Sequence, residues 1–138
     1  MADTRDPNPQ RLELEQLTQL QPGFARLMPE IATRFWKCAH AGRARNWTLA
    51  RWQLKEMTKL FRLGSVTRPK YADDVDEYLH DDIAPIMAAI DDGNSDRFEQ
   101  ALTEAVDAAN EYHRRWKKEF IVWKLPDQPP LDLDLRPL

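Results

Sequence analysis

The three histidines and the single cysteine are the side chains of this sequence best suited to chemistry. His113 lies in "DAANEYHRRW", residues 107–116, near the end of a segment with helical periodicity. Neutral imidazole is a good ligand for iron and zinc. The alternative is structural, because "HRRWKKEF" places cations at a helix end, where they interact favourably with the negative end of the helix dipole. Both interpretations stay open, and we favour the structural one.

Two other groups of residues are weaker candidates for a chemical site. "EYLH", Glu77 to His80, matches the Glu-x-x-His element of di-iron bundles, but those proteins carry it on two helices and this chain has one copy. Cys38 and His40 are two residues apart, so a helix turns them to different faces. The sequence contains no Gly-rich phosphate loop, no Ser-His-Asp order and no paired-cysteine zinc motif. We therefore expect a non-catalytic protein without a bound metal.

The composition predicts one all-α domain to position these residues. The chain has 138 residues, 42% of them hydrophobic and 31% charged, which is long enough to bury a single core. Glycine occurs four times, and Ala, Leu, Glu, Arg and Gln are helix formers. One cysteine excludes an internal disulfide.

Apolar residues spaced three and four apart predict helices in four stretches. The first covers about residues 12–41, with a break at Pro22 and Gly23 and with Pro29 inside it. The second is capped by Asn46 and ends at Gly64. The third covers about residues 73–91 and is kinked or restarted at Pro85, and the fourth runs from about residue 95 to the region of Trp116.

These stretches define three parts of the chain. Residues 1–10 are expected to be a disordered tail, residues 11–124 a helical bundle, and residues 125–138 an extended, proline-rich arm that lies against the bundle or hangs free. No run approaches the roughly 20 apolar residues of a membrane span, and no export signal is evident. We expect a cytoplasmic protein that does not interact with membranes.

Charge is distributed unevenly along the sequence. Residues 43–70 contain eight basic residues and one acid, whereas residues 71–111 contain thirteen acids and one arginine. The basic stripe of Arg51, Lys55, Lys59 and Arg62 could follow a phosphate backbone. The alternative is a match to the acidic helix, and a net charge of −3 with a pI near 5.6 favours it over nucleic-acid binding.

Several segments together resemble the cytochrome c′-type bundles. They are "FWKCAHAGRARNWTLARWQLKEM", an Arg-Pro linker, "AIDDGNSDRFEQALTEAVDAANEYH" and "FIVWKLP", and the resemblance extends from about residue 24 to 126. It implies an antiparallel four-helix bundle. It also implies a homodimer, because bundles of that family commonly pair through their first two helices.

The resemblance also identifies a haem position. Family members carry C-x-x-C-H on the last helix, with thioethers to haem from both cysteines and an iron ligand from the histidine. The matching residues here are Ala109, Tyr112 and His113, so the histidine is kept and no thioether can form. We expect a haem-free relative with a vestigial or noncovalent haem site at His113, Tyr112, Ala109 and Trp116.

Five tryptophans bear on whether that site is filled: Trp36, Trp47, Trp52, Trp116 and Trp123. Aromatic residues in bundles usually belong to cores or interfaces. If a haem-sized space has been vacated, large side chains must fill it or a small apolar ligand can occupy it. Tyr112 and Trp116 are the predicted filling residues.

The function expected from the sequence is a non-catalytic, cytoplasmic binding or protein-interaction module that binds no cofactor. One alternative is a noncovalent haem or metal sensor or redox protein that uses His113. Another is a protein that binds a small hydrophobic ligand. The expected partners are a second copy of the chain, an unidentified protein or a small apolar molecule.

Overall fold

The computed structural model describes residues 11–137, and within that range the chain is all-helical and contains no strand, as the sequence predicted. Residues 1–10, predicted as a disordered tail, lie outside the described range. The elements in chain order are α1 (Leu14–Leu20), α2 (Phe24–Arg43), α3 (Trp47–Thr67), the 3₁₀-helix η1 (Pro69–Tyr71), α4 (Ala72–Tyr78), the π-helix η2 (Leu79–Ile83), α5 (Ala84–Asp92) and α6 (Ser95–Arg115).

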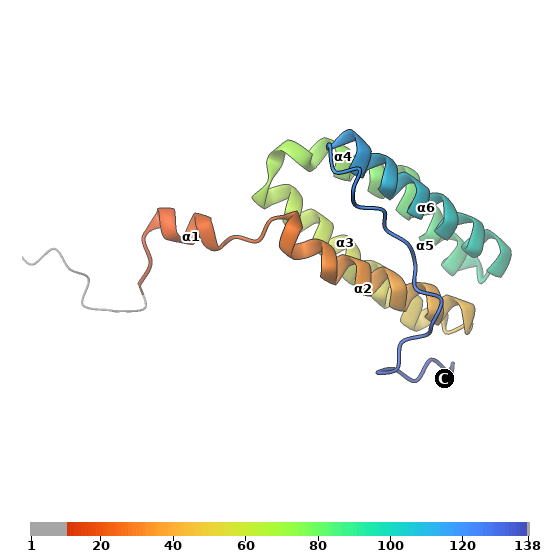
Figure 1. Cartoon of the computed structure of the whole chain (residues 1–138). Coiled ribbons are helices and arrows are strands. Elements are labelled where there is room, and N and C mark those ends of the chain that lie inside the picture. Colours follow the sequence, from red (N-terminus) through yellow and green to blue (C-terminus); the bar gives the residue numbers. More distant parts are fainter. Residues whose placement is uncertain (1–10, 138) are drawn as a thin grey trace, which may run out of the picture.

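The helices from α2 to α6 pack into a single helical body, residues 24–115 (Figure 1). Helices α2 and α3 lie side by side on one side of this body, and α5 and α6 lie side by side on the other. Helix α1 stands apart from the body. After α6 the chain becomes extended and runs back across α2. We call residues 121–137 the arm; it begins earlier than the boundary at residue 125 suggested by the sequence.

Side-chain caps fix the starts of the two longest inner helices. The Asn46 side-chain oxygen accepts a hydrogen bond from the Leu49 amide at 3.1 Å, as predicted for the start of α3. Asn94 caps α6 in the same way through the Arg97 amide at 3.0 Å. At the start of both α3 and α6, an asparagine side chain therefore accepts from a backbone amide that has no partner within the helix.

Gly64 does not end α3, contrary to the prediction. The helix continues to Thr67, and Gly64 is buried inside it. A Cβ atom at Gly64 would lie 2.3 Å from the ring of Phe24 in α2. The glycine is required by the close approach of an aromatic ring from another helix, a reason that the local sequence does not reveal.

Proline has different effects at its two positions inside the predicted helices. Pro29 is accommodated within α2, which begins at Phe24. Pro85 lies at the start of α5 and follows the π-helical segment η2, in which the Ala84 amide bonds to the Leu79 carbonyl. The wider π turn separates the proline ring from the preceding carbonyls. The predicted interruption at Pro85 is confirmed as a π-helical restart.

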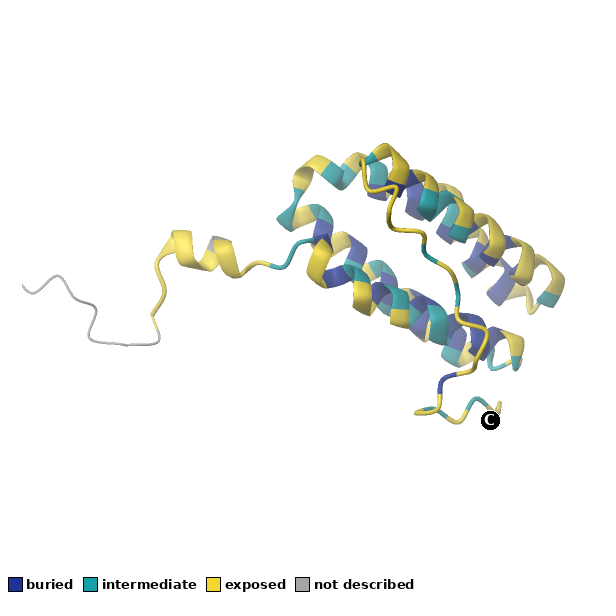
Figure 2. Ribbon diagram, in the orientation of Figure 1, coloured by how far each residue is buried: buried dark blue, intermediate teal, exposed yellow. Residues whose placement is uncertain are grey.

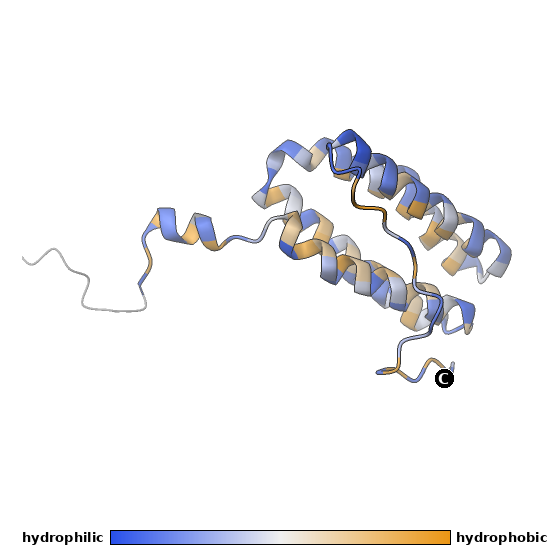
Figure 3. Ribbon diagram, viewed as in Figure 1, coloured by the Kyte–Doolittle hydropathy of each residue, from blue (hydrophilic) through white to orange (hydrophobic). Residues whose placement is uncertain are grey.

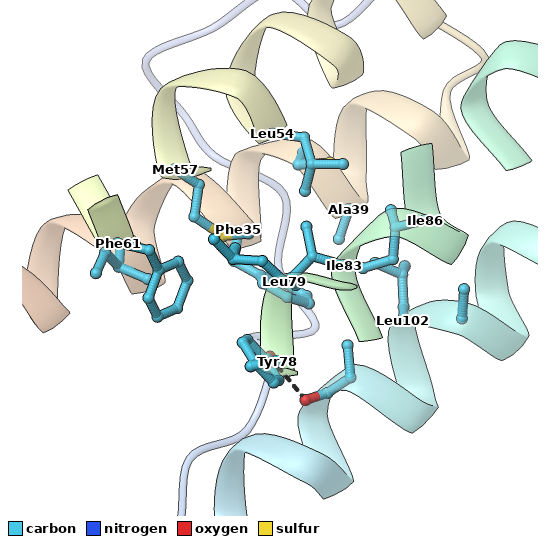
Figure 4. Packing of buried hydrophobic residues seen from close by; sticks show 14 of the residues in the cluster. Phe35, Ala39, Leu54, Met57, Phe61, Tyr78, Leu79, Ile83, Ile86 and Leu102 are labelled. Carbon is cyan, nitrogen blue, oxygen red and sulfur yellow. Dashed lines mark hydrogen bonds between the residues drawn. The ribbon is translucent and has the colours of Figure 1, made fainter. Parts of the chain in front are cut away.

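Figure 2 shows that the buried residues of α2, α3, α4, η2, α5 and α6 lie on the inner side of the body, and Figure 4 shows the packing of part of the hydrophobic cluster. The side chains contributed by the third predicted helix are Val75, Tyr78, Leu79, Ile83, Ile86, Ala89 and Ile90. Among these buried side chains Tyr78 carries a polar atom, its hydroxyl, which donates to the Ala105 carbonyl of α6 at 2.8 Å (Figure 4). None of the helices within residues 11–137 combines the length and apolarity needed to cross a membrane.

Ion pairs join the basic and acidic segments on the surface. Arg51 of α3 pairs with Asp91 of α5. Lys59 pairs within its own helix, with Glu56 at 2.9 Å. Arg43 of α2 also pairs with Glu99 of α6, at 2.6 Å. The two segments are therefore joined at Arg43 and Arg51, and the rest of the basic stripe stays on the surface of α3.

We expect Gly42→Ala to lower the free energy of unfolding by about 1–3 kcal/mol. A Cβ atom at Gly42 of α2 would lie 2.3 Å from the ring of Phe98 in α6, which is almost completely buried and cannot move aside freely. Chemical denaturation measures the loss. In the double variant Gly42→Ala/Phe98→Leu the smaller side chain makes room, so the combined loss should be less than the sum of the single losses; simple additivity would contradict this reason.

Candidate functional site

The arm is held across the helical body by side chains that donate to its backbone carbonyls. The carbonyls of an extended segment have no partner within that segment, so they bond either to water or to donors from other parts of the chain. The donors come from α2, α6 and the turn before α3. The bonds are His113 Nδ1 to Ile121 O at 3.1 Å, Asn110 Nδ2 to Trp123 O at 2.9 Å, His40 Nε2 to Pro126 O at 2.9 Å, Trp36 Nε1 to Gln128 O at 2.8 Å and Asn46 Nδ2 to Arg136 O at 3.3 Å.

Trp123 is the arm residue fixed most completely. Its amide donates to Asn110 Oδ1 at 2.8 Å while its carbonyl accepts from Asn110 Nδ2, so one amide side chain satisfies both backbone groups. The Trp123 ring packs edge-on against Phe35 of α2, with centroids 4.9 Å apart. Further along, Lys37 pairs with Asp132 at 2.7 Å. The arm thus connects α6 to α2 and lies against the body, whereas the sequence left open whether it would do so or hang free.

A cavity of about 750 Å³ lies where the arm begins. This volume is typical of pockets for small organic ligands, about 300–1,000 Å³. Apolar and aromatic side chains from α2, α3, η1, α4, α6 and the arm make up most of its wall: Phe24, Ala25, Met28, Pro29, Ile31, Ala32, Phe35, Phe61, Tyr71, Tyr78, Ala109, Trp116, Ile121 and Trp123. The deeper wall contains buried residues such as Ile31 and Phe35, so the interior is a hydrophobic surface.

His113 is the titratable imidazole in the cavity wall. His113 is only 7% exposed and lines the cavity. Because Nδ1 donates to the Ile121 carbonyl, the neutral ring carries its proton on Nδ1. Burial lowers the pKa of His113 below its ordinary value of 6.5, which favours this neutral form. The Nε2 lone pair has no hydrogen-bond partner within residues 11–137. His113 can therefore accept a hydrogen bond from a ligand or coordinate a metal.

Three of the four residues predicted for a haem site lie in the wall of this cavity, and all four, Tyr112 included, line a smaller cavity that adjoins it. Ala109 and Trp116 line the larger cavity with His113. The Trp116 ring packs on Tyr71, with centroids 4.4 Å apart, and its Nε1 donates to Asp74 at 2.7 Å. Trp116 consequently forms part of the wall and leaves the cavity open.

Tyr112 instead faces α4 and an adjoining cavity of about 30 Å³. Its hydroxyl donates to Glu77 Oε1 at 2.6 Å, and its ring packs edge-on against Tyr78. Burial and the hydrogen bond to Glu77 raise the pKa of Tyr112 above its ordinary range. This side chain attaches α6 to α4 and is absent from the wall of the larger cavity.

The weaker groupings do not form chemical sites. His80 is exposed and contacts Asp81 at 2.8 Å, whereas its motif partner Glu77 accepts from Tyr112. No cluster of three or more His, Cys, Asp or Glu suited to a metal occurs within residues 11–137. Burial raises the pKa of the Cys38 thiol to about 12, and His40 donates to the arm, so these two do not form a nucleophilic pair.

Gln19 of α1 and Gln21 also line the cavity. So do four cations that the sequence did not single out: Arg26, Arg68, Lys70 and Lys118. They come from α2, the start of η1 and the start of the C-terminal extension, and no aspartate or glutamate accompanies them. Three of them are exposed and Arg68 is half-buried, which places them at the mouth rather than in the interior. No local motif unites these residues, because only the folded chain brings their segments together.

Comparisons of the chain with protein-family models, with curated proteins and with solved structures found no match. The resemblance to cytochrome c′ therefore rests on the sequence motifs alone.

We expect His113 to make stability depend on pH. Its pKa is lower in the folded chain than in the unfolded chain, so the stabilisation is fully present above the unfolded value, about 6.5, and is lost as the pH falls below that value through the lower pKa of the folded chain. His113→Asn keeps a donor for the Ile121 carbonyl but cannot be protonated in this range. Denaturation between about pH 8 and pH 5 should show wild type losing stability relative to this variant, and parallel curves would contradict the assignment.

Proposed function

We propose that the protein is a non-catalytic carrier or sensor of a small apolar molecule, built on an antiparallel four-helix bundle of the cytochrome c′ type. The observation that supports this most directly is the cavity of about 750 Å³ with its aromatic and aliphatic wall. Transfer of apolar ligand surface out of water would supply the binding energy. The cavity favours this function over the protein-interaction module that the sequence suggested first.

The side chains of the cavity favour binding over catalysis. A general acid–base site needs groups whose pKa values lie near the operating pH. Burial raises the pKa of Tyr78 far above that range, and the one thiol, Cys38, does not line the cavity. Among the buried residues of the lining, His113 is the remaining acid–base group, and no second titratable group forms a hydrogen bond with it within residues 11–137.

The arm gives this cavity a movable wall. Ile121 and Trp123 line the cavity, and both are held through backbone hydrogen bonds to α6. Exposed apolar side chains flank them, with Phe120 80% and Val122 74% exposed. Figure 3 shows the hydrophobic beginning of the arm lying over the body. Local opening of this segment would admit a ligand without unfolding the helices.

The uncharged fluorophore N-phenyl-1-naphthylamine tests the proposal. We expect saturable binding to the full chain with a rise in fluorescence, because the dye leaves water for the cavity. Ala32→Phe fills space in the wall and should weaken binding by about tenfold or more. Ala88→Phe, on the exposed side of α5, is the matched control and should bind as wild type does. Absence of saturable binding, or equal effects of both substitutions, would contradict the proposal.

Noncovalent haem is a second candidate, supported by the state of His113. Iron-ligating histidines commonly donate their other ring N–H to a carbonyl, as Nδ1 does here to Ile121, and this leaves Nε2 for the metal. Ala109 and Trp116 in the same wall would contact the edge of the macrocycle. The ligand set would be one protein histidine, with no covalent attachment.

Titration with hemin tests this candidate. If Nε2 ligates iron, wild type should give a sharp, shifted Soret band with a plateau at stoichiometric hemin, and His113→Ala should lose it. His40→Ala is the control, since His40 faces the arm and does not line the cavity. A free-hemin spectrum in wild type would eliminate haem while leaving the binding of other apolar molecules intact.

A further inference from the structure

We propose that the ligand of this cavity is an apolar anion, with its hydrophobic body in the interior and its acidic group at the cationic mouth. This inference rests on the proposed function and specifies the class of ligand. The mouth carries Arg26, Arg68, Lys70 and Lys118, whereas the lining contains no aspartate or glutamate. In a chain with a net charge of −3, such a segregation creates a local positive potential at the entrance of an apolar cavity.

These cations are available to a ligand. None of the four has a carboxylate within ion-pairing distance in the described part of the chain, although most arginines elsewhere on the surface pair with one, for example Arg43 with Glu99 at 2.6 Å. Lys70 lies over the ring of Tyr71, with its nitrogen 5.0 Å from the centroid. Because Tyr71 itself lines the cavity, this contact holds the ammonium group close to the apolar wall.

Arg68 has a different role at the mouth. Its guanidinium donates to the carbonyls of Thr67 at 2.8 Å and Gln21 at 3.3 Å, which attaches the segment before α2 to the end of α3. Carbonyl partners fix the side chain without neutralising its charge. Arg68 therefore contributes a permanently positive group in a fixed position, while Arg26, Lys70 and Lys118 are exposed and can adjust to a ligand.

The beginning of α2 adds to the same potential. Gly23 gives this 20-residue helix no side-chain cap, and its first turn has no acidic residue. Gly23, Phe24 and Ala25 all line the cavity, so the positive end of the helix dipole is located at its mouth. An acidic ligand group would supply the negative charge that helices usually obtain from their own first turn.

The polarity of the site orients the ligand. The cations occupy the mouth, and buried hydrophobic side chains such as Ile31 and Phe35 occupy the interior, so a molecule with an acidic group at one end would enter with its apolar end first. Buried His113, neutral and with Nε2 unpaired, would face the body of the ligand rather than its acidic group. A carboxylate or sulfonate on an aromatic or aliphatic body satisfies both regions.

Two dyes that share an aromatic body but differ in charge test the inference. 1-Anilinonaphthalene-8-sulfonate carries a sulfonate, and N-phenyl-1-naphthylamine does not. The triple variant Arg26→Gln/Lys70→Gln/Lys118→Gln removes exposed mouth cations and leaves Arg68, which has a structural role. We expect the dissociation constant of the sulfonated dye to rise about tenfold and that of the neutral dye to change less than about twofold.

The matched control is Lys55→Gln/Arg62→Gln/Lys124→Gln, which removes the same charge from exposed cations outside the lining. It should leave both dissociation constants nearly unchanged. Circular dichroism verifies that each variant keeps its helices. In wild type, raising the salt concentration should weaken binding of the sulfonated dye alone, since screening acts on the charged contact.

The outcomes separate the inference from the proposed function. If the neutral dye binds in the cavity but the mouth substitutions leave the sulfonated dye unaffected, the acidic ligand class is wrong and the apolar site stands. Equal weakening of both dyes by the mouth variant also overturns the charge assignment. If neither dye binds to wild type, the proposed function fails first, and the inference fails with it.

Discussion

The hydrogen bonds between side-chain donors of the helices and carbonyls of the arm are the interactions on which the candidate site depends. An extended chain on a hydrophobic groove carries polar groups that cannot satisfy one another, and leaving them unpaired costs more than a paired bond gains. Asn110, His113 and His40 supply donors at successive points along the arm. Without them the same apolar residues would have little reason to adopt one register across α6 and α2.

The same bonds connect the arm to the chemistry of the cavity. His113 uses Nδ1 to hold the arm, and that bond fixes the tautomer that leaves Nε2 unprotonated. Asn110 positions Trp123, whose ring packs on Phe35 and closes the wall. Because one histidine contributes to both the clamp and the wall, a ligand that engages Nε2 would also influence how firmly the beginning of the arm is held.

Much of the fold could be predicted from local signals. The Asn46 cap and the restart at Pro85 depend on residues within a turn of one another, so the sequence displays them directly. Gly64 shows the limit of this reasoning. A glycine after an apolar run usually marks a helix end, but here the Phe24 ring from another helix needs the space, and α3 continues past it. Close packing between helices is invisible to a local pattern.

The residues of the candidate site also fall into those that the sequence predicts and those that only the folded chain reveals. By itself the sequence determined that His113 lies on the last helix with Ala109 and Trp116 at helical spacing, because a regular helix places residues three and four apart on one side. Only the tertiary structure decided that Tyr112 faces α4, that Trp123 returns to the wall and that cations from three separate segments surround the mouth. Those contacts join residues far apart in the chain, and their positions depend on the path of the arm across the packed helices.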